Sequence, residues 1–254
     1  KASGPDLLGN GWYREYAEIL APLLTTLLTL WYEAGVFPSS FLEADIFCLK
    51  KGGDQDNPLN YRPLALLNTD YKVFTRVLAT RVSKTLGDLI HTNQNRFVPH
   101  RHIHETIDLL TAAQLMARID PGQRDALALL LDFQKAYDSL DRHFLLDVLA
   151  RQGFSPRFIQ AVVAIHNGTT VRFLANGAKS RRIQVTSGIR QGCPLAPLLF
   201  ILALDPLYRR LDQAADIRGI RIRTASHSFV LHVAGYADDT AVYLRCSTST
   251  RRKR

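Results

Sequence analysis

Cysteine is scarce in this sequence, with only Cys48, Cys193 and Cys246 among 254 residues. Three cysteines that lie far apart exclude a disulfide scaffold and a cysteine-rich zinc module. Long apolar runs are also absent, since none approaches the ~18 residues that span a bilayer. No charged start followed by an apolar stretch and a cleavage site supports secretion. We therefore expect an intracellular protein outside the membrane, and a nuclear location is compatible with this composition.

Methionine occurs once, at Met116, and the chain starts at Lys1, so we expect a piece of a longer product. The composition is still that of a folded protein, because 46% of the residues are hydrophobic and 22% are charged. That apolar content is too high for a disordered chain. A chain of this length forms one large domain or two joined sub-domains, each able to bury a core.

Acidic residues are outnumbered, and the 32 Lys and Arg against 23 Asp and Glu give a net charge of +9. The basic tail, residues 251–254, supplies four of these nine charges and leaves +5 on the rest of the chain. A body of that charge favours polyanions such as nucleic acid as partners. The tail itself is typical of a solvated end or a localisation signal.

Hydrophobic periodicity predicts a mixed α+β fold with helices packed on a small sheet. The predicted helices cover residues 12–32, 71–89, 104–118, 143–151, 156–166 and 194–211. The predicted strands cover residues 41–49, 126–131, 171–174, 182–185, 229–234 and 240–244. Asp141 and Ser155 are expected to cap the helices that follow them, and Asn176-Gly177 predicts a hairpin turn.

Three aspartates stand where the predicted strands end. Asp132 follows a six-residue apolar run that is typical of a strand buried on both faces. Asp238 and Asp239 lie at the apex between two apolar strands, in a turn over residues 235–239 that we expect in the interior. Two neighbouring carboxylates repel each other by up to about 4 kcal/mol at an effective dielectric of 20. A divalent cation would neutralise such a pair, and Mg²⁺ prefers hard carboxylate oxygens.

The sequence around these aspartates resembles that of reverse transcriptases, most closely the non-LTR (LINE-type) retrotransposon enzymes. The resemblance covers nearly the whole chain in six ordered blocks. Two of them hold the aspartates: LDFQKAYD at residues 131–138 and YADD at 236–239. The others are KASGPD at 1–6, LKKG with NYRP at 49–52 and 60–63, QNRFVP at 94–99, and SGIRQGCPLAPLLF at 187–200.

The resemblance implies a role for each carboxylate. Asp132 and Asp238 would bridge two Mg²⁺ ions, with Mn²⁺ able to substitute, and Asp239 would contribute less. The Phe133 carbonyl is a further candidate metal ligand. Two such ions stabilise the attacking and leaving oxygens of an in-line phosphoryl displacement.

The resemblance also implies a set of nucleotide contacts. Tyr137 would lie beneath the incoming sugar, where its ring would collide with a ribose 2′-OH. Gln191 and Gly192 would lie along the nucleotide, since a glycine lets the backbone come close to a ligand.

Basic residues complete the implied nucleotide site. Arg62 would contact the triphosphate, together with either Lys50 or Lys51, and the sequence does not choose between the two lysines. Arginine suits phosphate geometry as a fork, whereas lysine acts as a point charge. Arg190 would orient either the Gln191 loop or the template.

The implied architecture is the fingers and palm of a right-hand polymerase. We expect a fingers-like region with N-terminal helices over residues 1–125 and a palm with a mainly antiparallel sheet over residues 126–250. The thumb and any endonuclease region of a parent polyprotein would be missing. The substrates would be an RNA template with a DNA primer and dNTPs.

Two alternatives remain open at this point. The chain could be a truncated, catalytically inactive retroelement remnant that at most binds RNA, because the thumb is missing and the end is rich in arginine. It could also be an RNA-dependent RNA polymerase, although such palms tend to offer a polar side chain where Tyr137 stands.

Overall fold

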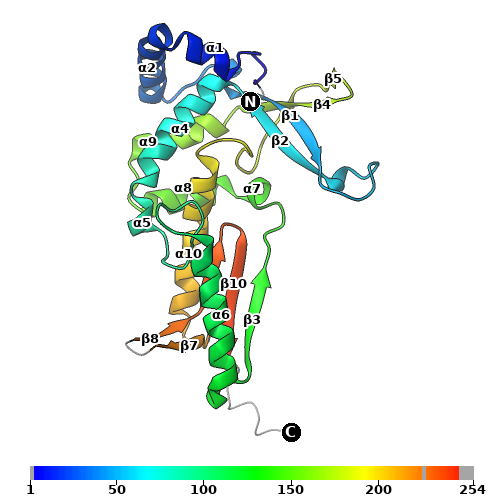
Figure 1. The fold of residues 1–254 in the computed structure, drawn as a ribbon. Coiled ribbons are helices and arrows are strands. Elements are labelled where there is room, and N and C mark those ends of the chain that lie inside the picture. Colours follow the sequence, from blue (N-terminus) through cyan, green and yellow to red (C-terminus); the bar gives the residue numbers. More distant parts are fainter. Residues whose placement is uncertain (1–2, 225–226, 246–254) are drawn as a thin grey trace. The chain divides into compact units, whose positions relative to one another are not determined.

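A computed structural model describes residues 3–224 and 227–245 (Figure 1). The predicted basic tail therefore lies outside the described residues. The helices are α1 (Asn10–Glu15), α2 (Ala17–Ala34), α3 (Ser39–Leu42), α4 (Thr69–Ser83), α5 (Leu86–Leu89), α6 (Ile103–Ile119), α7 (Ala136–Ser139), α8 (Arg142–Arg151), α9 (Pro156–His166) and α10 (Ala196–Gln213). The strands are β1 (Glu43–Lys50), β2 (Tyr61–Leu67), β3 (Ala126–Leu131), β4 (Thr170–Ala175), β5 (Ala178–Lys179), β6 (Ile183–Gln184), β7 (Ile220–Arg223), β8 (Ser228–Leu231), β9 (Val233–Tyr236) and β10 (Asp239–Arg245).

These elements confirm the α+β class expected from periodicity. Among the described residues, no helix combines the length and the apolar character needed to cross a bilayer. The chain divides into two compact units. Unit 1 comprises residues 1–81 and 137–199, and unit 2 comprises residues 82–136 and 200–254. Each unit takes residues from both sides of position 125, and the assignment of fingers and palm to the ranges 1–125 and 126–250 stays a prediction.

Unit 1 contains a five-stranded mixed sheet in the order β2-β1-β4-β5, with β6 also paired to β4. Strands β1 and β2 form an antiparallel pair, and β1 and β4 are parallel. The predicted turn at Asn176-Gly177 joins β4 to β5, and both residues have positive φ angles of 50° and 79°. Two positive φ angles are the signature of the type I′ turn that Asn-Gly favours.

An aromatic cluster fills the core of unit 1 where α2, α3 and α4 meet. Phe37 stacks on Phe41 with ring centroids 4.9 Å apart, and Phe74 meets Phe37 edge-on at 5.0 Å. Tyr71 lies 5.2 Å from Phe41 and is fully buried. Edge-to-face aromatic pairs add about 0.5–1.5 kcal/mol each beyond the area they bury. These rings fix the start of α4 against the helices that precede β1.

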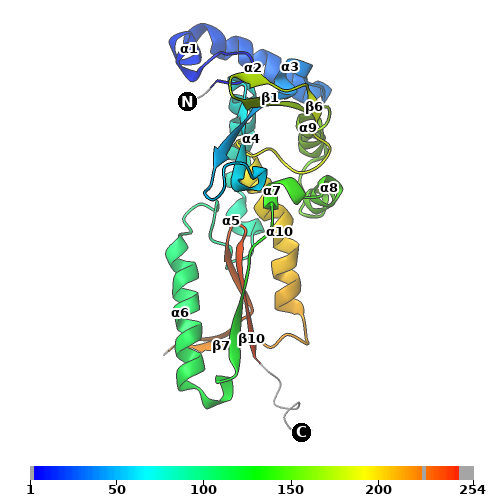
Figure 2. The same ribbon diagram turned by 90° about the vertical axis from the view of Figure 1, so that its right-hand side faces the viewer.

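Unit 2 is built around a three-stranded antiparallel sheet in the order β3-β10-β9. Figure 2 shows α6 and α10 on opposite sides of these strands. Tyr243 and Ala241 of β10 pack with Ala113 of α6 in one buried cluster. On the alternate side of the strand, Thr240 is bonded to the Tyr208 hydroxyl of α10 at 2.9 Å. The central strand β10 is thus covered on both faces.

Local signals predicted most helix boundaries. The Asp141 side chain accepts a hydrogen bond from the Phe144 N–H at 2.7 Å, and Ser155 accepts one from the Phe158 N–H at 3.3 Å, so both predicted caps are confirmed. The helix predicted over residues 12–32 is split into α1 and α2 at Tyr16. The helix predicted over 71–89 is likewise split into α4 and α5.

The strand predicted over residues 229–234 was wrong as a single element. It is divided at His232 into β8, which pairs with β7, and β9, which pairs with β10. The strand β7 was not predicted, although its sequence Ile-Arg-Ile-Arg alternates apolar and basic residues with only the isoleucines buried. Four alternating residues are too short a run to be distinguished from a loop by period alone.

The expectation that strand 126–131 is buried on both faces is contradicted. β3 has the predicted bounds, but its leucines are exposed, Leu130 by 72% and Leu129 by 46%. β3 lies at the edge of the three-stranded sheet, whereas the buried position at its centre belongs to β10. An apolar run indicates that a strand can be buried but does not specify its place in the sheet order.

Burial of His166 predicts a pH-dependent stability. Its ring is buried at the end of α9, and desolvation lowers the pKa of His166 from 6.5 to about 4. The unfolded chain therefore takes up this proton near pH 6.5, well before the folded chain does, so stability falls as the pH drops from 6.5 towards 4. We expect His166→Leu to remove about 3 kcal/mol of that decline in the free energy of unfolding.

Denaturant titrations across this pH range measure the effect. His143→Gln, a substitution at an exposed position on α8, is the matched control and should retain the full decline. An unaltered pH dependence in His166→Leu would contradict the role given to this histidine.

Candidate active site

The turn that carries Asp238 is tighter than predicted. Tyr236 and Asp239 pair across β9 and β10, which leaves only Ala237 and Asp238 in the loop. Ala237 has a φ of 62°, and Asp238 does not have a positive φ. A positive φ at the first loop position only is the pattern of a type II′ turn, whose twist matches that of the flanking strands. Two residues therefore reverse the chain and place Asp238 at the end of the sheet.

Register brings Asp132 to the same end of the sheet. Leu131, the last residue of β3, pairs with Thr240 of β10. Asp132 follows Leu131 and Asp239 precedes Thr240, so both lie one step beyond this pair on adjacent antiparallel strands. Asp238 comes one residue further, in the turn itself. Unit 2 thus gathers all three predicted carboxylates at one end of one sheet.

The carboxylates are more exposed than expected. Asp132 and Asp239 are exposed and Asp238 is half-buried, whereas Gly235 and Ala237 of the same turn are buried. The prediction of an interior turn therefore holds for part of its backbone and is wrong for the carboxylates, which reach water. Water therefore reduces the repulsion that we expected to make the acidic pair costly.

These carboxylates suit a hard divalent cation. Within the described residues none of them forms an ion pair or accepts a hydrogen bond from a side chain. No three His, Cys, Asp or Glu side chains in that part of the chain form a ready metal cluster. Mg²⁺ does not need a closed protein cage, because it is commonly held by one or two carboxylates together with substrate phosphates and water. The donor set therefore fits Mg²⁺ or Mn²⁺.

Phe133 follows Asp132 in the same unit. Its ring packs edge-on against Phe200 of α10, with centroids 6.4 Å apart. This contact anchors the chain directly after Asp132.

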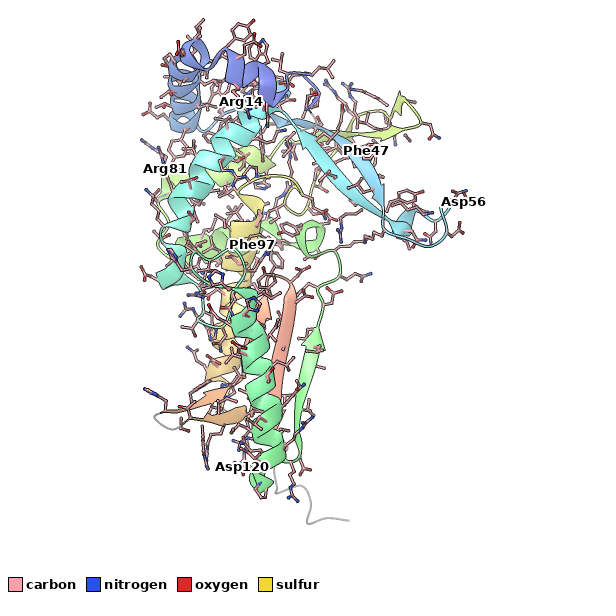
Figure 3. The ribbon with its side chains drawn as sticks, viewed as in Figure 1. Arg14, Phe47, Asp56, Arg81, Phe97 and Asp120 are labelled. Carbon is pink, nitrogen blue, oxygen red and sulfur yellow. The ribbon has the colours of Figure 1, made fainter. Side chains whose placement is uncertain are left out.

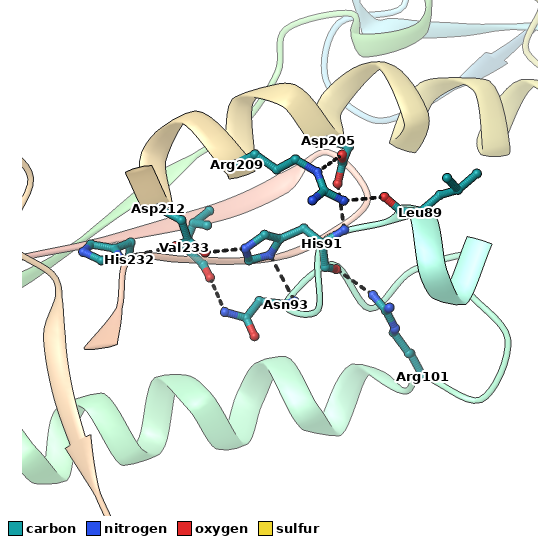
Figure 4. A network of polar contacts seen from close by, with 9 residues as sticks. All are labelled: Leu89, His91, Asn93, Arg101, Asp205, Arg209, Asp212, His232 and Val233. Carbon is teal, nitrogen blue, oxygen red and sulfur yellow. Dashed lines mark hydrogen bonds and ion pairs between the residues drawn. The ribbon is translucent and has the colours of Figure 1, made fainter. Parts of the chain in front are cut away.

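The segment of residues 89–95, here called the 89–95 loop, begins at the last residue of α5 and is tied to α10 by polar contacts (Figure 4). The Asp205 carboxylate accepts hydrogen bonds from the His91 N–H at 2.7 Å and from Arg209 at 2.5 Å. Asp212 contacts the His91 ring at 2.6 Å and the His232 ring at 3.2 Å. Both carboxylates lie on α10, one to two turns apart, so they hold the loop against that helix.

The same loop extends the sheet of unit 2 beyond β9. The Asn95 N–H donates to the Gly235 carbonyl at 3.0 Å, and the Gly235 N–H donates to the Asn93 carbonyl at 2.8 Å. The Asn93 side chain donates to the Val233 carbonyl at 2.9 Å. The outer edge of β9 is therefore paired, and the 89–95 loop reaches the turn that carries Asp238.

The predicted phosphate contacts lie in unit 1, on the hairpin of β1 and β2, whose connecting loop includes Asp56 (Figure 3). Arg62 pairs with Leu49, Lys50 pairs with Tyr61, and the Lys51 N–H donates to the Asn60 carbonyl at 2.8 Å. Because successive residues point to opposite faces of a strand, Lys50 and Arg62 lie on opposite faces of the hairpin. Lys51 follows the last residue of β1, and the choice between the two lysines as the triphosphate contact stays a prediction.

Gln191 and Gly192 lie along the outer edge of β2. The Ala65 N–H donates to the Gln191 carbonyl at 3.2 Å. Gly192 has a φ of 106°, and a Cβ at this position would lie 2.8 Å from the Ala65 carbonyl oxygen. Only glycine permits this close approach of two backbones.

Arg190 is a buried anchor for that loop. It is 6% exposed, its guanidinium donates to the Leu42 carbonyl, and it lies 5.2 Å above the ring of Tyr71. Burial lowers the pKa of Arg190. Of the two roles considered for this residue, the structure supports orienting the Gln191 loop, because the buried guanidinium leaves no surface for a template.

Tyr137 joins the same part of unit 1. Its carbonyl accepts a hydrogen bond from the Ile189 N–H at 2.8 Å, and Gly188 packs directly on its backbone. The structure therefore brings Tyr137, the Gln191 loop and β2 together in unit 1, while the carboxylates lie in unit 2. Gln94 lies within a predicted motif, but the sequence predicted no role for it, and it did not predict the anchoring residues Asp205 and Asp212. Each of these residues contacts a segment more than a hundred residues away, so its role could not be predicted from local sequence.

A family model described as reverse transcriptase (RNA-dependent DNA polymerase) matches residues 49–252. The Transposon TX1 uncharacterized 149 kDa protein of Xenopus laevis is 29% identical over 242 residues, which cover 94% of this chain and 18% of that protein. The Pol polyprotein of retrotransposable element R2 from Nasonia vitripennis is 27% identical over 84% of this chain and 20% of that protein. The RNA-directed DNA polymerase from mobile element jockey of Drosophila melanogaster is 25% identical over 95% of this chain and 25% of that protein.

Two solved structures of telomerase from Candida tropicalis share the fold. The apo enzyme, truncated from its C-terminal domain, matches with a TM-score of 0.52 at 12% identity, over 85% of this chain and 46% of that one. The complex with a fragment of telomeric RNA matches with a TM-score of 0.53 at 13% identity, over 91% of this chain and 41% of that one. The chain spans about a fifth of the length of the first two retrotransposon relatives.

The close packing of Gly235 against α10 predicts a specific intolerance. A Cβ at residue 235 would overlap the Tyr208 hydroxyl and lie 2.8 Å from the Asp239 carbonyl. We expect Gly235→Ala to reduce the free energy of unfolding by about 1–3 kcal/mol, as overpacked cores do. Removing the hydroxyl by Tyr208→Phe should relieve part of that loss.

A double-mutant cycle measured by denaturant unfolding tests this coupling. The double variant should be more stable than the sum of the single effects predicts, by at least about 0.5 kcal/mol. Strict additivity would show that the hydroxyl is not what excludes a side chain at position 235.

Proposed function

The chain belongs to the reverse transcriptase (RNA-dependent DNA polymerase) family, and from this premise we propose that it is the polymerising part of a non-LTR retrotransposon protein. It would join dNTPs to the 3′-OH of a DNA primer on an RNA template. The observation that carries this proposal is the placement of Asp132, Asp238 and Asp239 at one end of the β3-β10-β9 sheet. Asp132 is more than a hundred residues away from Asp238 and Asp239 in the sequence, and the pairing of β3 with β10 brings them to the same end of the sheet.

The carboxylates give unit 2 its proposed chemistry. Asp132 and Asp238 would hold the metal ions, with Asp239 and the Phe133 carbonyl in supporting positions. When bound, two Mg²⁺ ions stabilise the attacking and leaving oxygens of the phosphoryl transfer. The three side chains have no competing cationic partner among the described residues, so their charge is available to the metal.

The basic hairpin and the Gln191 loop give unit 1 its proposed nucleotide contacts. Arg62 of β2 and Lys51, directly after β1, would bind the triphosphate, whereas Lys50 lies on the face of the hairpin opposite Arg62. Gln191 and Gly192 would lie along the nucleotide, and the Tyr137 ring would select a deoxyribose by excluding a 2′-hydroxyl. The Tyr137 assignment favours DNA over RNA as the product.

A second candidate function, RNA binding without catalysis, is favoured by an arginine cluster on unit 2. The Arg245 N–H donates to the Arg218 carbonyl at 2.7 Å, which brings the end of β10 to the start of β7. The pKa of Arg245 is lowered by partial burial and then by the charges of Arg221 and Arg218. None of these three side chains has an ion-pair partner in the described ranges. Clustered arginines that have no ion-pair partner attract a phosphate backbone.

The rest of the setting is also proposed. Thumb and endonuclease segments would be supplied by other parts of a parent polyprotein, since the retrotransposon relatives are about five times as long as the matched region. The site of action would be intracellular, with the nucleus as the compartment that holds the target DNA.

Primer extension on an RNA template in Mg²⁺ tests the polymerase proposal. Asp132→Asn and Asp238→Asn should each lower dNTP incorporation by about 10²–10³-fold, because each removes charge stabilisation from the transition state. Asp239→Asn should have a smaller effect. Asp216→Asn changes an exposed aspartate of the same unit and should match the wild type.

Equal incorporation by the wild type and Asp238→Asn would refute the polymerase assignment. Salt-sensitive RNA binding by the wild type, with no incorporation in Mg²⁺ or Mn²⁺, would instead support the second candidate.

The register places Lys50 on the face of the hairpin opposite Arg62, and we therefore propose Lys51 as the lysine that binds the nucleotide. Lys51→Ala should raise the KM for dNTPs about tenfold with little change in kcat, as loss of one phosphate contact does. Lys50→Ala is the matched control, because it removes the same charge from the neighbouring position on the opposite face. A larger KM effect for Lys50→Ala in steady-state incorporation assays would reverse this assignment.

A further inference from the structure

The Gln94 side chain forms two hydrogen bonds with the backbone of Ala237, in the turn that carries Asp238. Its side-chain Oε1 accepts a hydrogen bond from the Ala237 N–H at 2.9 Å, and its Nε2 donates to the Ala237 carbonyl at 3.1 Å. Gln94 is 2% exposed, so both bonds lie away from water. The side-chain amide thus pairs with the backbone of Ala237 as a neighbouring strand would. Both bonded atoms of Ala237 belong to the residue directly before Asp238.

The bonded backbone is in a conformation that needs support. Ala237 has a φ of 62°, in the left-handed region that costs an L-residue other than glycine free energy. Ala237 is also buried, so its N–H and carbonyl could not be satisfied by solvent. The Gln94 amide satisfies both groups in this conformation.

Further hydrogen bonds hold Gln94 and the neighbouring residues of the 89–95 loop in place. Arg101 donates to the carbonyls of Gln94 at 2.9 Å and His91 at 2.6 Å. The Gln94 Oε1 also accepts a bond from the Arg96 N–H at 3.2 Å. Asp205 of α10 holds the other end of the loop through the His91 N–H (Figure 4). The 89–95 loop is therefore a rigid support and Gln94 is its point of contact with the turn.

We propose that Gln94 is a positioning residue that fixes the Asp238 carboxylate for the metal ions through its paired hydrogen bonds to Ala237. The metal part of this inference rests on the proposed function. The pairing requires one donor and one acceptor on a side chain of this length, which only glutamine supplies. Glutamate retains the acceptor for the Ala237 N–H but loses the donor for the Ala237 carbonyl. Methionine has a similar volume and offers neither a donor nor a comparable acceptor.

The test compares Gln94→Met, Gln94→Glu and the matched control Asn93→Ala in the whole chain. Asn93 belongs to the same loop and bonds the same strand, but its side chain contacts Val233, four residues before Ala237. Hydrogen exchange of the Ala237 amide reports directly on the proposed bond. We expect exchange about tenfold faster in Gln94→Met, an intermediate rate in Gln94→Glu, and the wild-type rate in Asn93→Ala.

Mn²⁺ titration followed by electron paramagnetic resonance is the second measurement, with Asp238→Asn to identify the site. Loss of a residue that orients a metal ligand weakens metal binding by about 10- to 100-fold. We expect a loss of this size in Gln94→Met and an unchanged affinity in Asn93→Ala. Recovery of part of the exchange protection in Gln94→Glu would separate positioning from simple loss of packing.

The two readouts distinguish failure of this inference from failure of the proposed function. If the wild type binds Mn²⁺ through Asp238 but Gln94→Met matches Asn93→Ala in both assays, the positioning role is overturned and the polymerase proposal stands. If no variant binds Mn²⁺ while the Ala237 amide still loses protection in Gln94→Met, the metal site fails and the hold of Gln94 on the turn is confirmed. Unchanged exchange in Gln94→Met overturns the inference in every case.

Discussion

The two-residue turn between β9 and β10 is the constraint on which the candidate site depends. Ala237 must hold a positive φ for β9 and β10 to pair up to Tyr236 and Asp239. Because β9 and β10 pair as far as these two residues, Asp238 lies in the loop just beyond the paired residues. Asp239 lies beside Asp132, the residue that follows β3. A longer loop would add conformations and free the carboxylates from the register of the sheet. Geometry suited to metal ions therefore follows from backbone pairing, without any side chain gripping the aspartates.

Each unit brings its own predicted site residues together from distant segments of the chain. Unit 2 aligns Asp132 with the turn through the β3–β10 register. Unit 1 sets the Gln191 loop against β2 through the Ala65 N–H and the close approach of Gly192. The carboxylates and the proposed nucleotide contacts thus rest on separate sets of interactions. Under the proposed function, loosening the Gln191 loop should impair nucleotide affinity, whereas loosening the β9–β10 turn should impair metal binding.

Local chemistry made part of this structure predictable. Ser155 and Asp141 cap their helices because a short polar side chain next to a free N–H is sufficient, whatever the rest of the chain does. The exposure of β3 could not be predicted, because an apolar run does not say whether a strand is central or at an edge. The placement of Lys50 on the face opposite Arg62 needed a register that only the paired strand provides. The aspartates themselves were found from motifs, but the support of their turn by Gln94 depends on contacts across 143 positions.

Buried polar groups need hydrogen-bond partners, and this need explains why the 89–95 loop is held by hydrogen bonds and ion pairs rather than by apolar packing. The 89–95 loop passes through the interior of unit 2 without forming a regular strand along its whole length, so its carbonyls need partners. Arg101 alone donates to the carbonyls of four residues of the segment 87–94, and Asp205 receives the His91 N–H. Such hydrogen bonds are directional, whereas apolar contacts allow a buried group to slide. A loop held in this way fixes the position of Gln94, and Gln94 in turn fixes Ala237. Ala237 directly precedes Asp238, the proposed metal ligand, which must be placed precisely.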